Sequence, residues 1–163
     1  MAMKRGATID GLEAVYRLRF REFCRVAAAI TGEESSGADA VHEAFVRAIS
    51  SRDSYRADAP LEAWVWRIVT NAALTRRARP GFEDEARQEA AVESESTPSD
   101  ELGLRAWVKE LPERQRLAIF LRYFSDLDYR GIALVLGVEV GTVSATLSAA
   151  HASLRKMLKE VPR

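Results

Sequence analysis

The segment Asp126–Leu147, DLDYRGIALVLGVEVGTVSATL, combines two short apolar stretches with a glycine between them. Its small residue Ala133 suits a point where two helices cross closely, and Gly137, four residues later, permits a tight turn. Val143, ten residues after Ala133, is placed to anchor a second helix against the first. This spacing predicts a helix-turn-helix, although an ordinary helical hairpin is also compatible with the pattern.

The first part of the chain has the periodicity of successive amphipathic helices. Apolar side chains recur every three or four residues from Leu12 to Ile30, and Gly32 follows as a stop. A second helix is expected over Asp39–Ile49, with Ile49 facing the core. The chain is expected to enter this helix through Ser35–Gly37.

A third helix is expected to begin at Pro60, which suits a first helical turn, with Asp58 as its cap. It is expected to end before Pro80. Trp64 belongs to its apolar face. Trp66 is two residues further on and cannot share that face, so we expect it to be the more exposed of the two tryptophans.

Two more helices are expected ahead of the helix-turn-helix. One covers Leu104–Leu111 and is stopped by Pro112, and the other covers Arg114–Phe124. No segment alternates apolar and polar residues as a half-buried strand would. The sequence therefore predicts an all-α fold.

The charge distribution predicts two small helical domains joined by a flexible acidic linker. Residues 1–79 hold 13 Lys+Arg and 10 Asp+Glu, residues 80–101 hold 1 and 8, and residues 102–163 hold 10 and 6. The middle segment is rich in Glu and Ser and has too few large apolar residues to form a core. We expect domains at 1–79 and 102–163, with the linker at 80–101.

Composition and residue types argue against several classes of protein. The chain is 47% hydrophobic and 29% charged, as in soluble folded proteins, and has neither a membrane-spanning apolar run nor a signal peptide, so a cytoplasmic protein is expected. Cys24 is the only cysteine and is expected to be a small packing residue. The sequence predicts no metal site, cofactor, small-molecule substrate or catalytic set, and therefore no enzyme.

The whole chain resembles a known family. LPERQRLAIFLRYFSDLDYRGIALVLGVEVGTV, Leu111–Val143, is similar to region 4 of the sigma-70 family. GADAVHEAFVRAI, Gly37–Ile49, and SYRADAPLEAWVWRIVTNAALTRRAR, Ser54–Arg79, are similar to region 2. These two regions joined by a linker are the layout of the extracytoplasmic-function (ECF) sigma factors. The resemblance implies core RNA polymerase and promoter DNA as partners, together with an inhibitory anti-sigma factor.

The resemblance also implies which residues meet each partner. Core polymerase would dock on the second helix, at Asp39, His42, Glu43 and Arg47. The minus-ten element would bind the following loop and the third helix, at Arg52, Tyr55, Arg56, Asp58, Arg67, Asn71, Arg76 and Arg77. The minus-thirty-five element would bind Arg122, Arg130, Thr142, Ser144, Ala145, Ser148 and Arg155.

The chemistry of these residues suits their implied roles without requiring them. A tyrosine such as Tyr55 can stack on a base, arginines hold phosphates, and Asp58 can accept a hydrogen bond from a base edge. Asp39 and Glu43 are four residues apart and can share one helical face. The same residues are also compatible with a loop and an acidic helical face that contact solvent only.

The helix expected to read the minus-thirty-five element is unusual because it offers small neutral residues where Arg or Lys are common in the family. Serine and threonine hydroxyls discriminate bases less strongly than a bidentate arginine does. Two functions therefore remain open. The chain is either a sigma factor that initiates transcription, or a sigma-like mimic that sequesters an anti-sigma factor without binding DNA.

Overall fold

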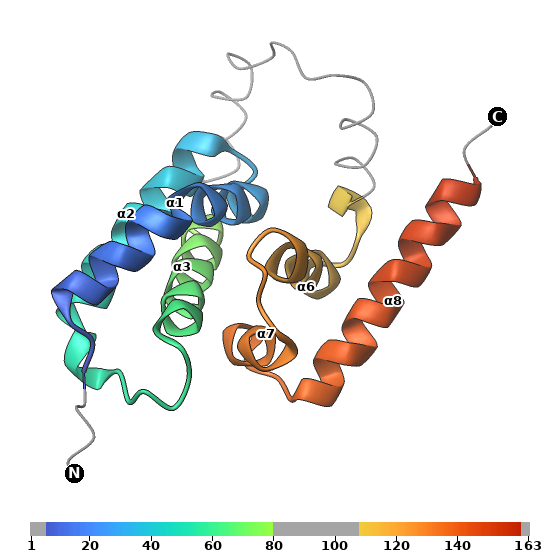
Figure 1. Cartoon of the computed structure of the whole chain (residues 1–163). Helices are drawn as coiled ribbons and strands as arrows, with labels where there is room; N and C mark the ends of the chain where they lie inside the picture. Colours follow the sequence, from blue (N-terminus) through green and yellow to red (C-terminus); the bar gives the residue numbers. More distant parts are fainter. Residues whose placement is uncertain (1–5, 80–107, 161–163) are drawn as a thin grey trace. The chain divides into compact units, whose positions relative to one another are not determined.

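The computed structural model describes residues 6–79 and 108–160, and the structural statements below refer to these residues. The chain divides into two compact units, Met1–Val92 and Glu93–Arg163, here called the first and second units. All regular structure in the described ranges is helical, which confirms the all-α prediction (Figure 1). The predicted linker lies outside the described residues, and the predicted domain boundaries stay a prediction.

The first unit is a bundle of three α-helices and one short 3-10 turn. These are α1 (Ile9–Thr31), α2 (Glu34–Ser50), η1 (Arg52–Ser54) and α3 (Leu61–Arg77). Thr8 caps α1 by accepting a hydrogen bond from the Gly11 amide at 3.0 Å. Gly32 ends α1 with φ at 85°, in the left-handed region that favours glycine, as the sequence predicts.

An aromatic cluster fills the core of this unit. Phe23 of α1 packs on Trp66 of α3 and on Phe45 of α2, with ring centroids 4.3 Å and 5.6 Å apart. Small residues line the remaining helix contacts, including Ala27, Ala44 and Ala73, all fully buried. One aromatic side chain from each of the three helices therefore meets the others in the core.

The predicted start of the second helix is wrong. α2 begins at Glu34, so Ser35–Gly37 forms its first turn and is not an entry loop. Gly37 lies where α2 crosses α1, and an added Cβ would stand 2.5 Å from the Ala28 backbone nitrogen. The glycine therefore permits a close helix crossing. At the other end, Ile49 is 42% exposed and does not belong to the core, contrary to the prediction.

Two predictions about the third helix are also wrong. Trp66 is fully buried, whereas Trp64 is half-buried, so the expected order of exposure is reversed. The cause is that α3 packs against both α1 and α2 and buries a wide stripe that includes position 66. The N-cap position is held by Pro60, and Asp58 stands before it in the exposed bend, so the carboxylate does not act as the predicted cap.

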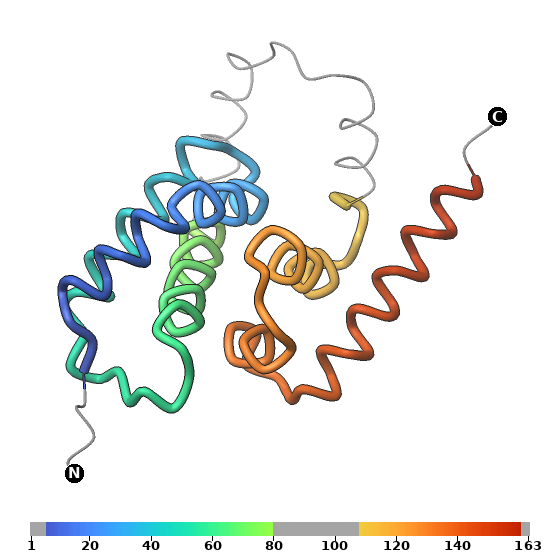
Figure 2. Tube along the Cα trace, in the orientation of Figure 1, coloured from blue at the N-terminus to red at the C-terminus, as the bar shows by residue number. Residues whose placement is uncertain are grey.

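The second unit contains the predicted helix-turn-helix. Residues 108–110 are helical, and α6 (Glu113–Tyr123), α7 (Tyr129–Leu136) and α8 (Val140–Lys159) follow. α7 and α8 meet at 96°, within the range of about 90–120° for this motif, which decides against an ordinary hairpin (Figure 2). Gly137 makes the turn with φ at 67°, and the Val138 amide donates to the Ala133 carbonyl at 3.1 Å.

The core of the second unit uses the residues that anchor the motif. Ile132 and Val143 are fully buried between α7 and α8, and Leu121 of α6 is buried with them. Asp128 caps α7 by accepting a hydrogen bond from the Gly131 amide at 2.8 Å. The orientation of α8 is thus fixed by packing on two helices.

Within residues 6–79 and 108–160, no single helix is both long enough and apolar enough to cross a membrane. The bent pair of α7 and α8 reaches that length and composition only when the two helices are taken together.

Candidate nucleic-acid interface

The loop between α2 and α3 is held in place by backbone hydrogen bonds from the N-terminal segment. The Gly6 amide donates to the Tyr55 carbonyl and the Ala7 amide to the Arg52 carbonyl, both at 2.8 Å. The Arg52 guanidinium donates to the Ile49 carbonyl at 2.9 Å, at the end of α2. Part of the hydrogen-bonding capacity of Arg52 is therefore used within the loop, and the N-terminal segment is part of the site.

Tyr55 lies half-buried at the centre of this loop. Its hydroxyl donates to the Ala59 carbonyl, and its ring centroid is 5.5 Å from that of Trp64. Burial and the nearby negative charge of Asp58 raise the pKa of the Tyr55 hydroxyl above its usual value, so the side chain is neutral at physiological pH. The structure thus presents an uncharged, oriented aromatic ring beside a second aromatic side chain.

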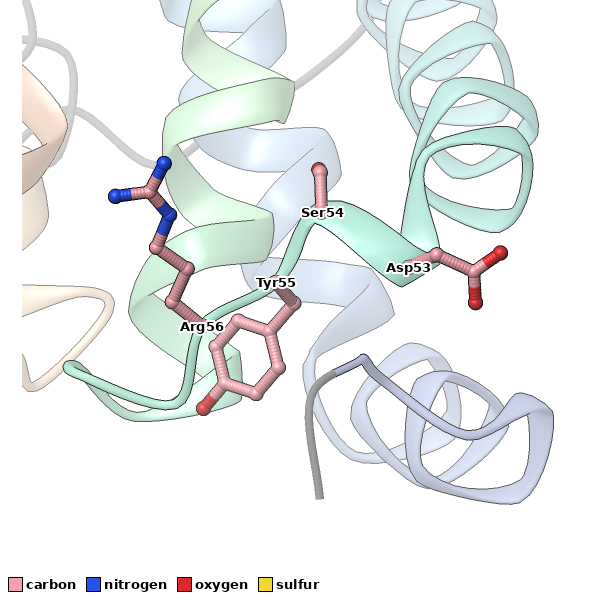
Figure 3. Close-up of a pocket in the computed structure, with 4 residues that line it drawn as sticks. All are labelled: Asp53, Ser54, Tyr55 and Arg56. Atoms are coloured by element: carbon pink, nitrogen blue, oxygen red, sulfur yellow. The ribbon is translucent and has the colours of Figure 1, made fainter. Parts of the chain in front are cut away.

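A pocket that is partly open to solvent accompanies this ring. It is lined by Asp53, Ser54, Tyr55 and Arg56. Figure 3 shows the Asp53 and Arg56 side chains on opposite sides of the tyrosine, with Arg56 extended away from the backbone. The arrangement offers a stacking surface, hydrogen-bonding groups and a cation, which are the groups that hold an unpaired base and its phosphate.

The α3 helix adds polar side chains to the first unit's surface. Arg67 and Asn71 are exposed and one helical turn apart, whereas Arg77 in the last turn is half-buried. Arg76 donates to the Asp39 carboxylate at 3.0 Å. Arg67 and Asn71 therefore stay accessible, and Arg76 is already paired with an acidic residue of α2.

The acidic face of α2 is more engaged than the sequence suggests. Glu43 accepts hydrogen bonds from Arg47 at 2.8 Å and from Arg79 at 3.3 Å. His42 is exposed and lies over Phe20, with ring centroids 5.9 Å apart. The residues assigned by resemblance to polymerase and to the minus-ten element thus meet in one cluster at the end of α3.

The residues of α8 that were assigned to the minus-thirty-five element lie on the exposed face of this helix. Thr142, Ser144, Ala145 and Ser148, all assigned to the minus-thirty-five element, are exposed. Because none of these four side chains is charged, these positions provide hydroxyl groups and methyl groups only.

The arginines on and near α8 differ in their exposure and in the contacts they already make. Arg130 and Arg155 are exposed. Arg122 donates to the Leu127 carbonyl at 3.2 Å, and its guanidinium carbon lies 5.7 Å from the Tyr129 ring centroid. Phosphate binding at this unit would therefore rely first on Arg130 and Arg155.

Three features of these sites were not predicted. They are the Trp64 ring beside Tyr55, the pairing of Arg76 and Arg79 with Asp39 and Glu43 of α2, and a hydrogen bond at 2.8 Å between Tyr123 of α6 and His151 of α8. The last two join residues far apart in sequence, and no local pattern signals such pairs. The sequence indicated only that position 64 is aromatic, and so able to pack on another ring, and that position 79 is basic, and so able to pair with an acidic residue.

Metal-binding clusters of three or more His, Cys, Asp or Glu side chains do not occur in the described ranges. Cys24 is half-buried, and burial raises the pKa of its thiol, which lowers its reactivity.

Each of the two units contains a segment that matches a known protein family. The family described as Sigma-70 region 2 matches residues 15–81, and the one described as Sigma-70, region 4 matches residues 103–154. The chain belongs to the sigma-70 family. Sigma factors of this family are non-catalytic initiation factors of transcription, and the helix-turn-helix of the second unit is the region 4 element.

The relatives place this sigma factor in the ECF group. It is 29% identical over 143 residues to the ECF RNA polymerase sigma-E factor of Escherichia coli (strain K12), a match that spans 77% of this chain and 75% of that one. It is 24% identical over 167 residues to the ECF RNA polymerase sigma factor SigW of Bacillus subtilis (strain 168), over 91% and 85% of the two chains.

Solved structures share the fold of this sigma factor. The sigma factor RpoE, in complex with the anti-sigma factor NepR from Bartonella quintana, matches with a TM-score of 0.73 at 22% identity, over 94% of this chain and 100% of that one. CnrH, in complex with the cytosolic domain of CnrY, matches with a TM-score of 0.71 at 20% identity, over 96% and 92% of the two chains.

Proposed function

We propose that this ECF sigma factor directs core RNA polymerase to promoters by using the first unit to capture the opened minus-ten element and the second to hold the minus-thirty-five element. The observation that carries the proposal is the ordered pair of sigma-70 regions, each on its own helical unit. Bond making belongs to the polymerase. The sigma factor contributes binding, orientation and strand capture.

Capture of the minus-ten element rests on the α2–α3 loop. The Tyr55 ring is half-buried and oriented, so it can stack on an unpaired base with little loss of side-chain entropy. Arg56 beside the pocket supplies charge for a phosphate, and Arg67 with Asn71 extends the polar surface along α3. Arg52 supports the loop through its hydrogen bond to Ile49, Asp58 is exposed and can accept a hydrogen bond from a base edge, and Trp64 lies beside the ring.

Recognition of the minus-thirty-five element rests on α8. Thr142, Ser144 and Ser148 can exchange hydrogen bonds with base edges, and Ala145 can contact a thymine methyl group. Hydroxyl contacts discriminate less than bidentate arginine does, so the affinity of this unit alone is expected to be low. Polymerase that binds both units would supply the remaining affinity by raising the effective concentration of the second contact.

Docking of core polymerase is assigned to the exposed face of α2. Asp39 and His42 are exposed, Glu43 is half-buried, and Arg47 is exposed, so the face carries both signs of charge. Regulation by an anti-sigma factor is part of the proposal, because both solved relatives described above were captured with their partner proteins. The partner for this chain is expected to compete for polymerase-binding surface.

A sigma-like mimic is the second candidate, and one observation favours it. The exposed face of α8 is uncharged at Ser144, Ala145, Ser148 and Ala149, which suits a protein partner better than a phosphate backbone. A mimic would bind an anti-sigma factor and would open no promoter in the presence of core polymerase.

Promoter melting tests the proposal at Tyr55. A promoter with a fluorescent adenine analogue in its minus-ten element is mixed with core polymerase and wild-type protein, Tyr55→Ala or Tyr55→Phe. We expect Tyr55→Ala to reduce the open-complex equilibrium about fivefold or more, because base stacking on an aromatic ring contributes about 1–3 kcal/mol.

The matched variant Tyr55→Phe keeps the ring and removes only the hydroxyl bond to Ala59. It is expected to retain most of the melting signal. Equal loss in both variants would assign the effect to the hydroxyl and contradict base stacking. A wild-type protein that binds core polymerase but melts no promoter would contradict the sigma function and support the mimic.

A further inference from the structure

The end of α3 is tied to α2 by an ion-pair cluster that was not expected from the sequence. The Arg76 guanidinium lies 3.0 Å from the Asp39 carboxylate, and the Arg79 guanidinium lies 3.3 Å from that of Glu43. Arg47 shares Glu43 at 2.8 Å. Two acidic residues one turn apart on α2 thus hold one arginine in the last turn of α3, Arg76, and one just beyond the end of that helix, Arg79.

The cluster joins two binding surfaces. Under the proposed function, on which this inference rests, Asp39 and Glu43 face core polymerase, whereas Arg76 belongs to the promoter-binding helix. A guanidinium paired with a carboxylate attracts a phosphate less strongly than a free one, because the local charges cancel. The same carboxylates therefore control how much positive charge α3 presents to DNA.

The Arg76 pair is easily rearranged. The Asp39 side chain is 59% exposed, so another cation can reach it, while the Arg76 side chain is only 23% exposed. The Nε atom of Arg76 is buried and has no hydrogen-bond partner within the described residues, which costs free energy that a rearranged side chain would recover. Exposed ion pairs are weak, so a competing cation can displace this one.

We propose that Asp39 and Glu43 mask Arg76 and Arg79 in the free protein, and that cationic side chains of core polymerase release these arginines for promoter DNA when they engage α2. The two binding events are then thermodynamically linked. Polymerase docking strengthens DNA binding, and DNA binding strengthens docking by the same factor.

The test compares two neutralising substitutions in the full chain, Asp39→Asn and Glu13→Gln. Glu13 pairs with Arg17 at 2.7 Å on α1, away from the cluster, so both variants lose one negative charge and one exposed ion pair. The readout is fluorescence anisotropy of a labelled DNA duplex of mixed sequence, titrated without polymerase at several salt concentrations.

Asp39→Asn is expected to bind this duplex about threefold more tightly than wild type, the size of effect that an exposed ion pair allows. The slope of log affinity against log salt is expected to steepen by about one, because one more cation reaches a phosphate. Glu13→Gln is expected to change neither quantity appreciably. Adding Arg76→Ala to Asp39→Asn is expected to abolish the gain.

Equal tightening in Asp39→Asn and Glu13→Gln would overturn the proposal, because net charge alone would explain it. Weaker binding by Asp39→Asn would also overturn it, because Asp39 would then be holding Arg76 in a productive position. These outcomes concern DNA binding by the free protein. They are therefore distinct from a failure of the sigma function, which shows as no promoter opening by the wild type with core polymerase.

Discussion

Truncation of Trp66 to alanine is expected to destabilise the first unit by about 3–5 kcal/mol, the range for removing a large aromatic side chain from a core. Trp66 is fully buried and packs on Phe23 with ring centroids 4.3 Å apart. Its loss leaves a cavity where α1, α2 and α3 meet. Denaturant-dependent hydrogen exchange of amides in α1 and α3 measures the change in free energy of unfolding for this unit alone.

Trp64→Ala is the matched comparison, because it removes the same side chain two residues away. Trp64 is half-buried and contacts Tyr55, so this variant is expected to lose clearly less stability than Trp66→Ala and to weaken promoter melting instead. A larger loss of stability in Trp64→Ala would contradict the assignment of Trp66 to the core and restore the order expected from the sequence.

Replacement of Gly37 by alanine is expected to destabilise the first unit by about 3 kcal/mol, at the upper end of the usual range for overpacking. The added Cβ would stand 2.5 Å from the Ala28 nitrogen and 2.8 Å from the Ala28 Cα. Both atoms are backbone, so no side chain can rotate away to make room. Relief requires α1 and α2 to separate, which loosens the core that they share.

Gly141→Ala is the control for Gly37→Ala. Gly141 lies in the first turn of α8, where an added Cβ would meet nothing within 4 Å. This change is expected to be neutral or to stabilise the second unit by up to about 1 kcal/mol, through helix propensity alone. An unchanged free energy of unfolding in Gly37→Ala, measured by hydrogen exchange in α1 and α2, would show that the helices do not cross this closely.

The sequence predicted the fold where local chemistry decides it. Gly32 and Gly137 stand at positive φ in the structure, and both were identified as stops or turns. Gly37 was misassigned because a glycine serves equally well in a turn and at a close helix crossing. The choice between these depends on Ala28, which no local pattern connects to position 37.

The tryptophans illustrate a second limit. Helical periodicity establishes that Trp64 and Trp66 point in different directions, but not which of them faces the core. α3 packs on two helices at once, and the resulting wide buried stripe includes Ala63, Val65 and Val69 as well as Trp66. The packing partners of a helix are tertiary information, which one helix's sequence does not contain.

The candidate sites were predicted as residue types and locations, not as interactions. Arg67 and Asn71 are exposed on α3, consistent with their proposed role. The pairing of Arg76 with Asp39 joins residues 37 positions apart and changes the charge that α3 presents. The assignment of individual residues to polymerase or DNA stays a prediction that the variants above test.

The most direct test of the central claim is transcription of sheared genomic DNA from the source organism by purified core polymerase, with and without the wild-type protein, followed by sequencing of transcript 5′ ends. The account predicts a set of start sites that appears only when the protein is added and that shares two upstream sequence elements. Identical start sites with and without the protein, despite a stable complex with core polymerase, would contradict it.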